Sequence, residues 1–367
     1  MDIYQKYNLK HVINADGKMT ILGVSKVSNE VVEATKLGAQ NFFEMNELLI
    51  QTGKYLANLV GSEDALIVNS ASAGIAESIA GLIGQGSMYH LHHPYTNRIT
   101  KREVILPMGH DVDYGTPVEV MIQLAGGKMV PAGYANMCTP EHIEMQITEQ
   151  TAAILYIKSH HTVQKSMLSI SEAIRIAHNH NLPLILDAAA EEDLYKYLKL
   201  GADVVIYSGA KAIEGPASGV IFGKKDYISW ARLQGAGIGR AMKIGKENII
   251  GLTGAIEKYL RDGTETGQQM IDRLKPFVQS LSELPDLEVN IIQDAAGREI
   301  YRAEVKPTGK ISALEICDQL RNGKTAIYAR EYRVNQGIIE FDIRSVNAEE
   351  MGQIVARLKE IIGGSRK

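Results

Sequence analysis

The sequence predicts an α/β protein in which a large domain with a mostly parallel β-sheet is followed by a smaller α+β domain. Short apolar runs alternate with amphipathic stretches of helical period through the first two thirds of the chain, which is typical of repeated βα units. Two of these runs, Leu184–Asp187 and Asp203–Lys211, end in an acid and a lysine and flank one helix, as in a βαβ unit. Strands and helices then follow in a less regular order, and we place the domain boundary between residues 255 and 256.

The elements expected in the large domain follow one another at a regular pitch. An amphipathic helix is expected at Glu44–Leu59, where apolar residues recur at helical spacing. The runs expected to form buried strands are Ala65–Val68, Val104–Leu106, Met129–Val130, Ala152–Ile157, Leu184–Asp187, Asp203–Lys211 and Gly219–Gly223. The helices expected between them begin after Asn69, at Pro117, at Thr139 with Pro140 in its first turn, and at Ser169, where Glu172 completes a capping box. Right-handed crossovers between these strands would give a mostly parallel sheet.

The two ends of the chain give different expectations. Val12–Gly23 is rich in turn-forming residues and too polar for a core strand, so we expect an irregular arm that covers a ligand. One long helical region is expected from Lys246 to Leu274, bridging to the small domain. The small domain is expected to contain strands at Leu287–Ile292, Glu299–Val305 and Gly337–Ile343 and helices at Ile311–Leu320 and Ala348–Ile362.

Composition excludes several classes of function. The 367 residues are 45% hydrophobic and carry 39 basic and 43 acidic side chains, a net charge of −4. This balance argues against a nucleic-acid partner bound by bulk electrostatics, although a local basic patch remains open. The N-terminus lacks a signal-peptide core, and no run approaches the ~20 apolar residues of a membrane span. Cys138 and Cys317 lack neighbours at metal-ligand spacing, so we expect no metal and a reduced, cytoplasmic location.

Asp187 and Lys211 point to a cofactor. Ligands of open α/β sheets bind at the carboxyl ends of the strands, so the two side chains are expected to face one crevice. A lysine and a carboxylate in this arrangement suit pyridoxal 5'-phosphate. The lysine would hold the cofactor as a Schiff base, and the carboxylate would keep the pyridine nitrogen protonated so that the ring can accept electrons.

The turn after the Ala65–Val68 strand is the expected cradle for the cofactor phosphate. Its residues are small and open a helix, so backbone N–H groups and the helix dipole can attract an anion; they are Ser70, Ala71, Ser72, Ala73 and Gly74. The hydroxyl group of Ser208, three residues before the lysine, could reach the same phosphate. Taken alone, the turn would be an ordinary strand-to-helix connection, because no Gly-Lys-Ser/Thr follows it.

With these motifs, the chain resembles the fold-type-I pyridoxal-phosphate enzymes of the aspartate-aminotransferase superfamily. The segments that carry a narrower resemblance are Ile13–Gly17, Asn69–Gly74, Ser159–Lys165 and Gly239–Glu247. They are similar to the selenocysteine-synthase-like branch, and within it to the D-glucosaminate-6-phosphate ammonia-lyase family. The resemblance implies that Lys211 is the Schiff-base lysine and Asp187 the partner of the ring nitrogen.

The resemblance also implies roles for other side chains. One of the adjacent His160 and His161 would stack on the cofactor ring, with His161 favoured because it lies nearer the loop; a satisfied polar residue at a strand end is the alternative. Arg344 would bind the substrate carboxylate, or else be a solvated strand-end arginine. The remaining substrate contacts would come from the arm and from a basic segment: Asn14, Gly17, Thr20, Arg240 and Lys243.

The reaction that the resemblance implies is dehydration and deamination of D-glucosaminate 6-phosphate to 2-keto-3-deoxygluconate 6-phosphate and ammonia. The residues themselves indicate only an α,β-elimination or a related amino-acid reaction. Two alternatives remain: a selenium transferase acting on aminoacyl-tRNA, and a non-catalytic protein that keeps the fold. Active sites of this superfamily are often completed across a subunit interface, so a homodimer or larger homo-oligomer is expected.

Overall fold

The computed structural model describes residues 2–159, 161–294 and 297–365. The chain divides into two compact units, residues 27–263 and residues 1–26 with 264–367. The N-terminal arm thus groups with the C-terminal part of the chain, and the larger unit ends eight residues beyond the position expected from the sequence, at 263 instead of 255. His160 lies outside the described residues.

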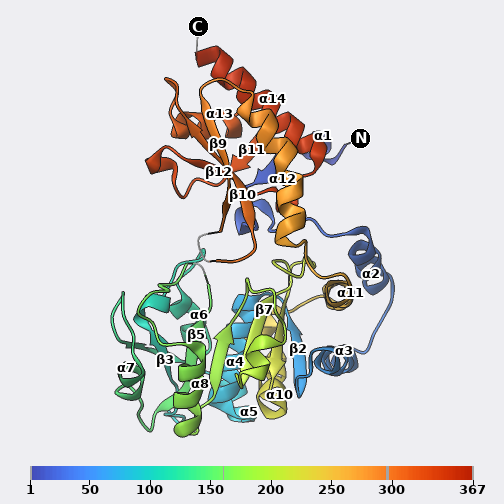
Figure 1. Cartoon of the computed structure of the whole chain (residues 1–367). Helices are drawn as coiled ribbons and strands as arrows, with labels where there is room; N and C mark the ends of the chain where they lie inside the picture. The colour runs from blue at the N-terminus through green and yellow to red at the C-terminus, as the bar shows by residue number, and fades with distance from the viewer. Residues whose placement is uncertain (1, 160, 295–296, 366–367) are drawn as a thin grey trace. The chain divides into compact units, whose positions relative to one another are not determined.

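A mixed sheet forms the centre of the larger unit (Figure 1). Within the described residues its seven strands run in the order β2 (Asp64–Val68), β8 (Gly219–Gly223), β7 (Val204–Ser208), β6 (Leu184–Asp187), β5 (Thr151–Ile157), β3 (Glu103–Pro107) and β4 (Lys128–Ala132). Strand β8 is antiparallel to both of its neighbours, and the other neighbouring pairs are parallel. The mostly parallel sheet predicted from the apolar runs is therefore present.

Helices cover both faces of this sheet, which explains why its central strands are apolar throughout. Alternate residues of β2 belong to different cores: Leu66 packs with Ile75 and Ile79 of the next helix, whereas Ile67 packs with Leu56 on the other face. The helices of this unit are α2 (Asn29–Gln40), α3 (Met45–Val60), α4 (Ala71–Gly84), α5 (Met88–His92), α6 (Val118–Leu124), α7 (Pro140–Glu144), α8 (Ile170–Asn179), α9 (Lys196–Lys199), α10 (Lys225–Leu233) and α11 (Lys246–Asp262).

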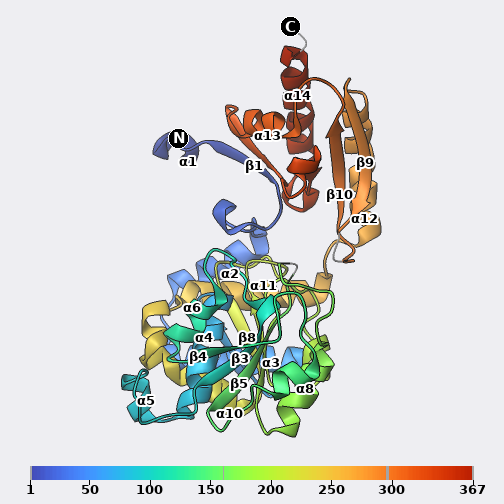
Figure 2. The ribbon, with the colours of Figure 1, turned by 90° about the vertical axis from the view of Figure 1, so that its left-hand side faces the viewer.

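The smaller unit is built from both ends of the chain. Strands β9 (Leu287–Gln293), β10 (Tyr301–Pro307) and β12 (Ile339–Phe341) form an antiparallel sheet, and helix α12 (Gly267–Ser282) packs on β9 and β10 (Figure 2). The other elements are α1 (Ile3–Tyr7), β1 (His11–Ala15), α13 (Ala313–Arg321), β11 (Thr325–Ala329) and α14 (Ala348–Ser365). One apolar core joins the elements of this unit other than α1.

Two sequence expectations were wrong. The segment expected to be only an irregular arm contains β1, which pairs in parallel with β11 and buries Ile13 and Ala15. The helical region expected from Lys246 to Leu274 is two helices, α11 and α12. It breaks at Gly263, whose φ of +70° suits glycine, and restarts at Thr266, whose side chain caps α12.

The described residues also bear on membrane association. None of the helices formed by these residues combines the length and the apolar character that a bilayer crossing requires.

Candidate active site

A tight turn after β7 presents Lys211 at the edge of the sheet. The N–H of Gly209 donates to the Ser218 carbonyl at 2.9 Å, and the N–H of Gly215 donates to the Gly209 carbonyl at 2.7 Å. A Cβ atom on Gly209 would lie 2.2 Å from Ser218 Oγ, so only glycine allows this close approach. The turn therefore holds the half-buried Lys211 directly beyond the end of a central strand.

Asp187 ends the neighbouring strand, β6, and interacts electrostatically with Lys211. Its Oδ1 accepts a hydrogen bond from the Ala189 N–H at 3.0 Å. Burial raises the pKa of Asp187 to about 6, while the nearby Lys211 charge and the Ala189 bond act in the opposite direction. The structure thus brings together the two residues on which the cofactor prediction depends, although their chemical roles remain proposals.

Helix α4 begins at the same edge of the sheet. The Ser70 hydroxyl caps it by accepting from the Ala73 N–H at 3.0 Å, and the Gly74 N–H donates to the Ser70 carbonyl at 3.0 Å. The backbone N–H groups of Ala71 and Ser72 have no hydrogen-bond partner among the described residues. Two free donors at the positive end of a helix dipole form a favourable environment for a phosphate.

The register of the sheet places this helix beside the lysine turn. Gly219, the first residue of β8, pairs with Val68 on one side and with Ser208 on the other. A Cβ atom on Gly219 would lie 2.6 Å from the Ser70 carbonyl carbon, so glycine lets the start of α4 pack directly on β8. The strand ends that lead into the predicted cradle and into the lysine turn therefore flank the same residue, Gly219. Ser208, which ends β7 before the lysine turn, is half-buried.

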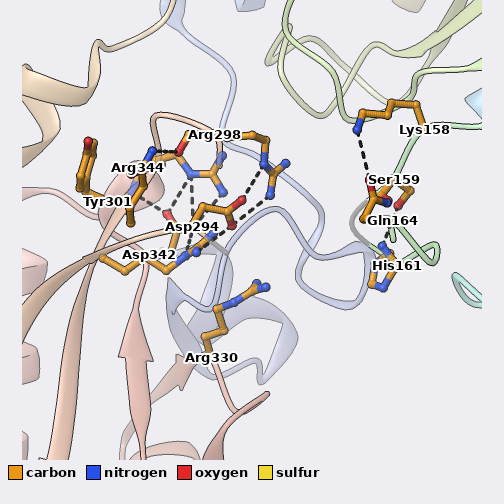
Figure 3. A network of polar contacts seen from close by, with 12 residues as sticks. Lys158, Ser159, His161, Gln164, Asp294, Arg298, Tyr301, Arg330, Asp342 and Arg344 are labelled. Carbon is orange, nitrogen blue, oxygen red and sulfur yellow. Dashed lines mark hydrogen bonds and ion pairs between the residues drawn. The ribbon is translucent and has the colours of Figure 1, made fainter. Parts of the chain in front are cut away.

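The loop after β5 carries His161. The Gln164 side chain closes this loop by donating to the Ser159 carbonyl at 2.6 Å, and the Lys158 ammonium donates to Gln164 Oε1 at 3.3 Å (Figure 3). The His161 N–H donates to Ser159 Oγ at 3.2 Å, and its side chain is exposed. Because His160 lies outside the described residues, the choice of ring-stacking histidine remains a prediction.

Sequence reasoning missed two other residues near this edge. His110 is buried after β3, where its Nδ1 accepts from the Ile157 N–H at 3.4 Å; burial and the Lys158 charge lower its pKa to about 4, so the ring is neutral. The Tyr114 hydroxyl is buried and has no hydrogen-bond partner within the described part of the chain. Neither residue had a sequence signal, because both follow a strand within an ordinary polar loop.

The smaller unit holds Arg344 in a cluster of ion pairs (Figure 3). Asp342 is fully buried and accepts hydrogen bonds from the Arg344 guanidinium on both oxygens: from Nε to Oδ1 at 2.9 Å and to Oδ2 at 3.2 Å, and from Nη2 to Oδ2 at 2.8 Å. Arg302 bridges Asp342 and Asp294 at 3.2 and 2.9 Å, and Arg298 also pairs with Asp294. Arg344 is thus oriented by a buried carboxylate, so the alternative of a freely solvated arginine does not describe it.

The arm residues form a closed turn in the same unit. Asn14 Oδ1 accepts from the N–H groups of Asp16 and Gly17, and Asn14 Nδ2 donates to the Gly17 carbonyl at 2.7 Å. A Cβ atom on Gly17 would lie 3.4 Å from Asp342 Oδ2, which places this turn against the ion-pair cluster. Thr20 begins a short 3₁₀ turn that follows.

The basic residues at and before the start of α11 are of two kinds. The Lys246 ammonium donates to the carbonyls of Gly38 and Ala39 at 2.7 and 2.6 Å, so it stabilises the end of α2. Arg240 and Lys243 are both exposed, and neither has a side-chain hydrogen bond or ion pair among the described residues. These two remain candidates for an anion.

The residues of the larger unit fit pyridoxal 5'-phosphate. A lysine and a buried carboxylate interact at a strand-end edge, free backbone donors begin α4 beside them, and the Tyr114 hydroxyl lacks an acceptor among the residues described. Arg344, Asn14, Gly17 and Thr20 belong to the other unit, so their contacts with a substrate remain predictions.

Known proteins resemble this chain over most of its length. The family model for SelA, L-seryl-tRNA selenium transferase, matches residues 12–286. The chain is 46% identical over 363 residues to a D-glucosaminate-6-phosphate ammonia lyase of Salmonella typhimurium (strain 14028s / SGSC 2262), which covers 98% of each chain. It is 33% identical over 365 residues to a 5'-C-glycyluridine monooxygenase-decarboxylase of a Streptomyces species, covering 98% of this chain and 92% of the relative.

Solved structures share the fold of this chain. The structure of D-glucosaminate-6-phosphate ammonia-lyase matches with a TM-score of 0.94 and 45% identity over 100% of both chains. An aspartate aminotransferase from Thermotoga maritima matches with a TM-score of 0.54 and 15% identity, covering 98% of this chain and 94% of that one, so it shows the fold alone. The predicted fold class and cofactor are confirmed. This chain belongs to the SelA-like family of pyridoxal-phosphate enzymes, which has the aspartate-aminotransferase fold.

Proposed function

We propose that this protein is an ammonia-lyase that converts D-glucosaminate 6-phosphate to 2-keto-3-deoxygluconate 6-phosphate. The observation that carries the proposal is the electrostatic interaction of Lys211 with the buried Asp187, at the sheet edge where α4 also begins. The substrate is inferred from the Salmonella relative, which shares 46% of its residues with this chain and carries that name.

The cofactor supplies an aldehyde that reacts with amines and a ring that accepts electron density from an adjacent carbanion. We assign to Lys211 both the attachment of the cofactor and the removal of the C2 proton of the substrate. Asp187, once ionised, holds the proton on the ring nitrogen. The free N–H groups at the start of α4 bind the phosphate together with Ser70, whose hydroxyl can donate while it caps the helix.

Loss of the C3 hydroxyl group requires a proton, because hydroxide is a poor leaving group. The candidates for this donor are Lys211, after it has taken the C2 proton, and His161. The hydroxyl group then leaves as water and the C2=C3 bond forms, which gives an enamine. The enamine takes a proton at C3 and becomes a C2 imine, and one water molecule hydrolyses this imine to the ketone and ammonia. Water is lost once and consumed once, so the net change is release of ammonia.

The substrate has two anionic groups, and each needs a cationic partner. Arg344 is proposed for the carboxylate, because the bidentate Asp342 pair orients its guanidinium. Arg240 and Lys243 are proposed for the phosphate, because neither is engaged by another described side chain. The Asn14–Gly17 turn and Thr20 are proposed to contact the sugar chain.

We also propose that the protein forms a homodimer or a larger homo-oligomer. Large apolar side chains are exposed on α2 and in the segment before α3: Val32, Leu37, Phe42 and Phe43, with Phe42 fully exposed. An apolar patch of this kind is typical of a protein interface. Phe42→Asp should therefore shift the sedimenting species toward the 40.3 kDa monomer. A wild-type protein that sediments as a monomer at micromolar concentration would contradict this proposal.

The function is tested by incubating the cofactor-loaded protein with D-glucosaminate 6-phosphate and measuring ammonia. Ammonia release is expected from the wild type and from Lys199→Ala, an exposed lysine of α9, and is expected to be absent from Lys211→Ala. Borohydride reduction followed by peptide mass spectrometry should locate the cofactor on Lys211.

The outcomes distinguish an error in the substrate assignment from an error in the cofactor site. A borohydride adduct at Lys211 without ammonia release would remove the substrate assignment and leave the cofactor site standing. An adduct at another lysine would overturn the site itself. Incubation with seryl-tRNA tests the alternative transferase activity, which is expected to be absent.

A further inference from the structure

Tyr114 lies in a loop whose shape is fixed by local hydrogen bonds. The loop joins β3 to α6 and is closed by an antiparallel bridge between Asp113 and Pro117. Asp113 Oδ1 accepts from the Gly115 N–H at 2.8 Å, and Gly115 has a φ of +117°, which favours glycine. The Tyr114 ring packs on the apolar core that α4 shares with the sheet. The position of the phenol is therefore set by the fold.

The hydroxyl group of Tyr114 is a donor without an acceptor in the described part of the chain. Its oxygen is buried and makes no hydrogen bond of good geometry with these residues. Burial raises the pKa of this phenol, the Ser72 hydroxyl at the start of α4 lies within hydrogen-bonding reach and lowers it, and the charge of Asp187 raises it. The phenol thus stays protonated at neutral pH and lies near both Ser72 and Asp187.

An acceptor is expected at this position for an energetic reason. Leaving a buried hydroxyl group without a partner destabilises a protein, so such groups in native proteins meet a ligand or a water molecule in the functional state. In pyridoxal phosphate one ring carbon separates the ring nitrogen from the ring carbon that carries the phosphorylated CH2 group. A donor near both Asp187 and the start of α4 would therefore face the edge of the cofactor that carries the phosphate.

We infer that the Tyr114 hydroxyl donates a hydrogen bond to the phosphate of the cofactor, completing the anion site at the start of α4. This inference rests on the proposed cofactor site at Lys211 and Asp187, and it does not depend on the identity of the substrate. Tyr114 is a positioning residue in this scheme. It fixes the phosphate end of the cofactor while Lys211 holds the aldehyde end.

The test compares pyridoxal 5'-phosphate with pyridoxal, which lacks the phosphate. Apoprotein is prepared from the full-length chain, and each compound is titrated while the Schiff-base absorbance is followed. Tyr114→Phe should raise the dissociation constant for pyridoxal phosphate about ten- to a hundred-fold, as expected for loss of a hydrogen bond to a charged group, and should change that for pyridoxal less than two-fold. The ³¹P resonance of the bound phosphate should also shift.

Two tyrosine variants control for indirect effects. Tyr156→Phe removes a buried hydroxyl that already donates to the Leu168 carbonyl at 3.0 Å, so it should destabilise the fold without changing the ratio of the two dissociation constants. Tyr134→Phe, at an exposed site, should change neither the stability of the fold nor the ratio of the two dissociation constants. Thermal unfolding of each apoprotein shows whether the variants fold.

Three results would overturn the inference. If Tyr114→Phe has the same ratio of dissociation constants for pyridoxal phosphate and pyridoxal as the wild type, the hydroxyl does not contact the phosphate. An equal loss of affinity for both compounds would place the hydroxyl on the ring side, near Asp187. Failure of the wild-type protein to form the Schiff base at Lys211 would instead remove the proposed cofactor site on which the inference rests.

Discussion

Asp187 shows how one buried side chain makes the site sensitive to pH. Burial raises the pKa of its carboxyl to about 6 in the cofactor-free protein, above the ordinary value of 3.8. Its neutral form is therefore favoured by folding, and the stability this gives is complete below pH 3.8 and is lost as the pH rises through 6. A protonated pyridine nitrogen needs the opposite state, the carboxylate. Cofactor binding and apoprotein stability should thus respond to pH in opposite directions.

We predict that the cofactor affinity of the wild type falls relative to that of Asp187→Asn as the pH drops below 6. The asparagine cannot ionise, so changes in the variant report the titration of the cofactor phosphate and of other groups. At pH 7 to 8 the wild type should bind at least about ten-fold more tightly, and at pH 5 the difference should narrow because the wild-type carboxyl is then mostly neutral. Dissociation constants measured at pH 5, 6, 7 and 8 check this. A ratio independent of pH would contradict it.

Residues at strand ends were accessible to sequence reasoning, and loop residues were not. Lys211 and Asp187 follow apolar runs, so the topology of a parallel sheet is enough to place them at one edge. Tyr114 lies in a polar loop, and only the fold shows that its hydroxyl is buried near Ser72 and Asp187. Arg344 was expected from a resemblance alone. Its orientation by Asp342 depends on a buried ion-pair cluster that has no signal in the sequence.

At the scale of elements, the contact between β8 and α4 controls the anion site. Gly219→Ala would place a Cβ atom 2.6 Å from the Ser70 carbonyl carbon and 2.7 Å from the Ala71 nitrogen, and both are backbone atoms that cannot move alone. The start of α4 must then shift. We predict a loss of about 1–3 kcal/mol in unfolding free energy and at least about a ten-fold weaker affinity for pyridoxal phosphate.

Gly352→Ala is the matched control for this substitution. Gly352 lies in α14, and apart from its chain neighbours and the nearby backbone of its own helix no described atom lies within 4 Å of the position that its Cβ atom would take. Alanine there should therefore stabilise the helix by about 0.5–1 kcal/mol and leave cofactor affinity unchanged. Urea titration gives the unfolding free energies. Equal cofactor affinity in the wild type and Gly219→Ala would show that the α4 turn does not determine phosphate binding.

Glu77 gives helix α4 a second pH-dependent property. This residue is buried against the 3₁₀ turn η4 (Ile238–Met242): a Cβ atom on Gly239 would lie 3.0 Å from Glu77 Cδ. Burial raises the pKa of Glu77 to about 8, so its contribution to stability is complete below pH 4.5 and is lost as the pH rises through 8.

Glu77→Gln should therefore unfold like the wild type at pH 5 and be more stable at pH 9, by an amount on the order of 3 kcal/mol. Glutamine stays neutral at both values, which is why the difference grows with pH. Urea unfolding at pH 5, 7 and 9 measures it, with the exposed Glu149→Gln as the control. A difference that is the same at all three values would refute a buried, protonated Glu77.

Elements whose stability comes from their own neighbourhood were predictable from the sequence. The Leu184–Asp187 strand is apolar because both of its faces are covered, and the Ser169–Glu172 capping box starts α8 as expected. Strand β1 has no such local signal, because its partner β11 lies some three hundred residues away in the chain. The break between α11 and α12 did have signals, Gly263 and the Thr266 capping box, but the continuing helical period concealed them.

At the scale of the whole molecule, the smaller unit is discontinuous, since it needs both ends of the chain. Strand β1 supplies the buried Ile13 and Ala15 to its core, and the Ala15 carbonyl accepts from the Asp342 N–H at 2.8 Å. Asp342 is also the carboxylate that orients Arg344. Residues near the N-terminus therefore support a C-terminal side chain that is proposed to bind substrate.

Removing residues 1–15 should accordingly loosen the smaller unit and leave the larger one intact. Without β1, strand β11 has lost its parallel partner and Ile327 is less well covered by apolar side chains. The lost burial of the Ile13 side chain alone should lower the unfolding free energy by about 1.5–3 kcal/mol. Hydrogen–deuterium exchange should quicken in β11 and stay slow in β7. Removing only residues 1–9 is the matched control, because α1 buries none of its residues. If β11 exchanges equally slowly in both truncations, the N-terminal strand is not part of the core that holds Asp342 and Arg344.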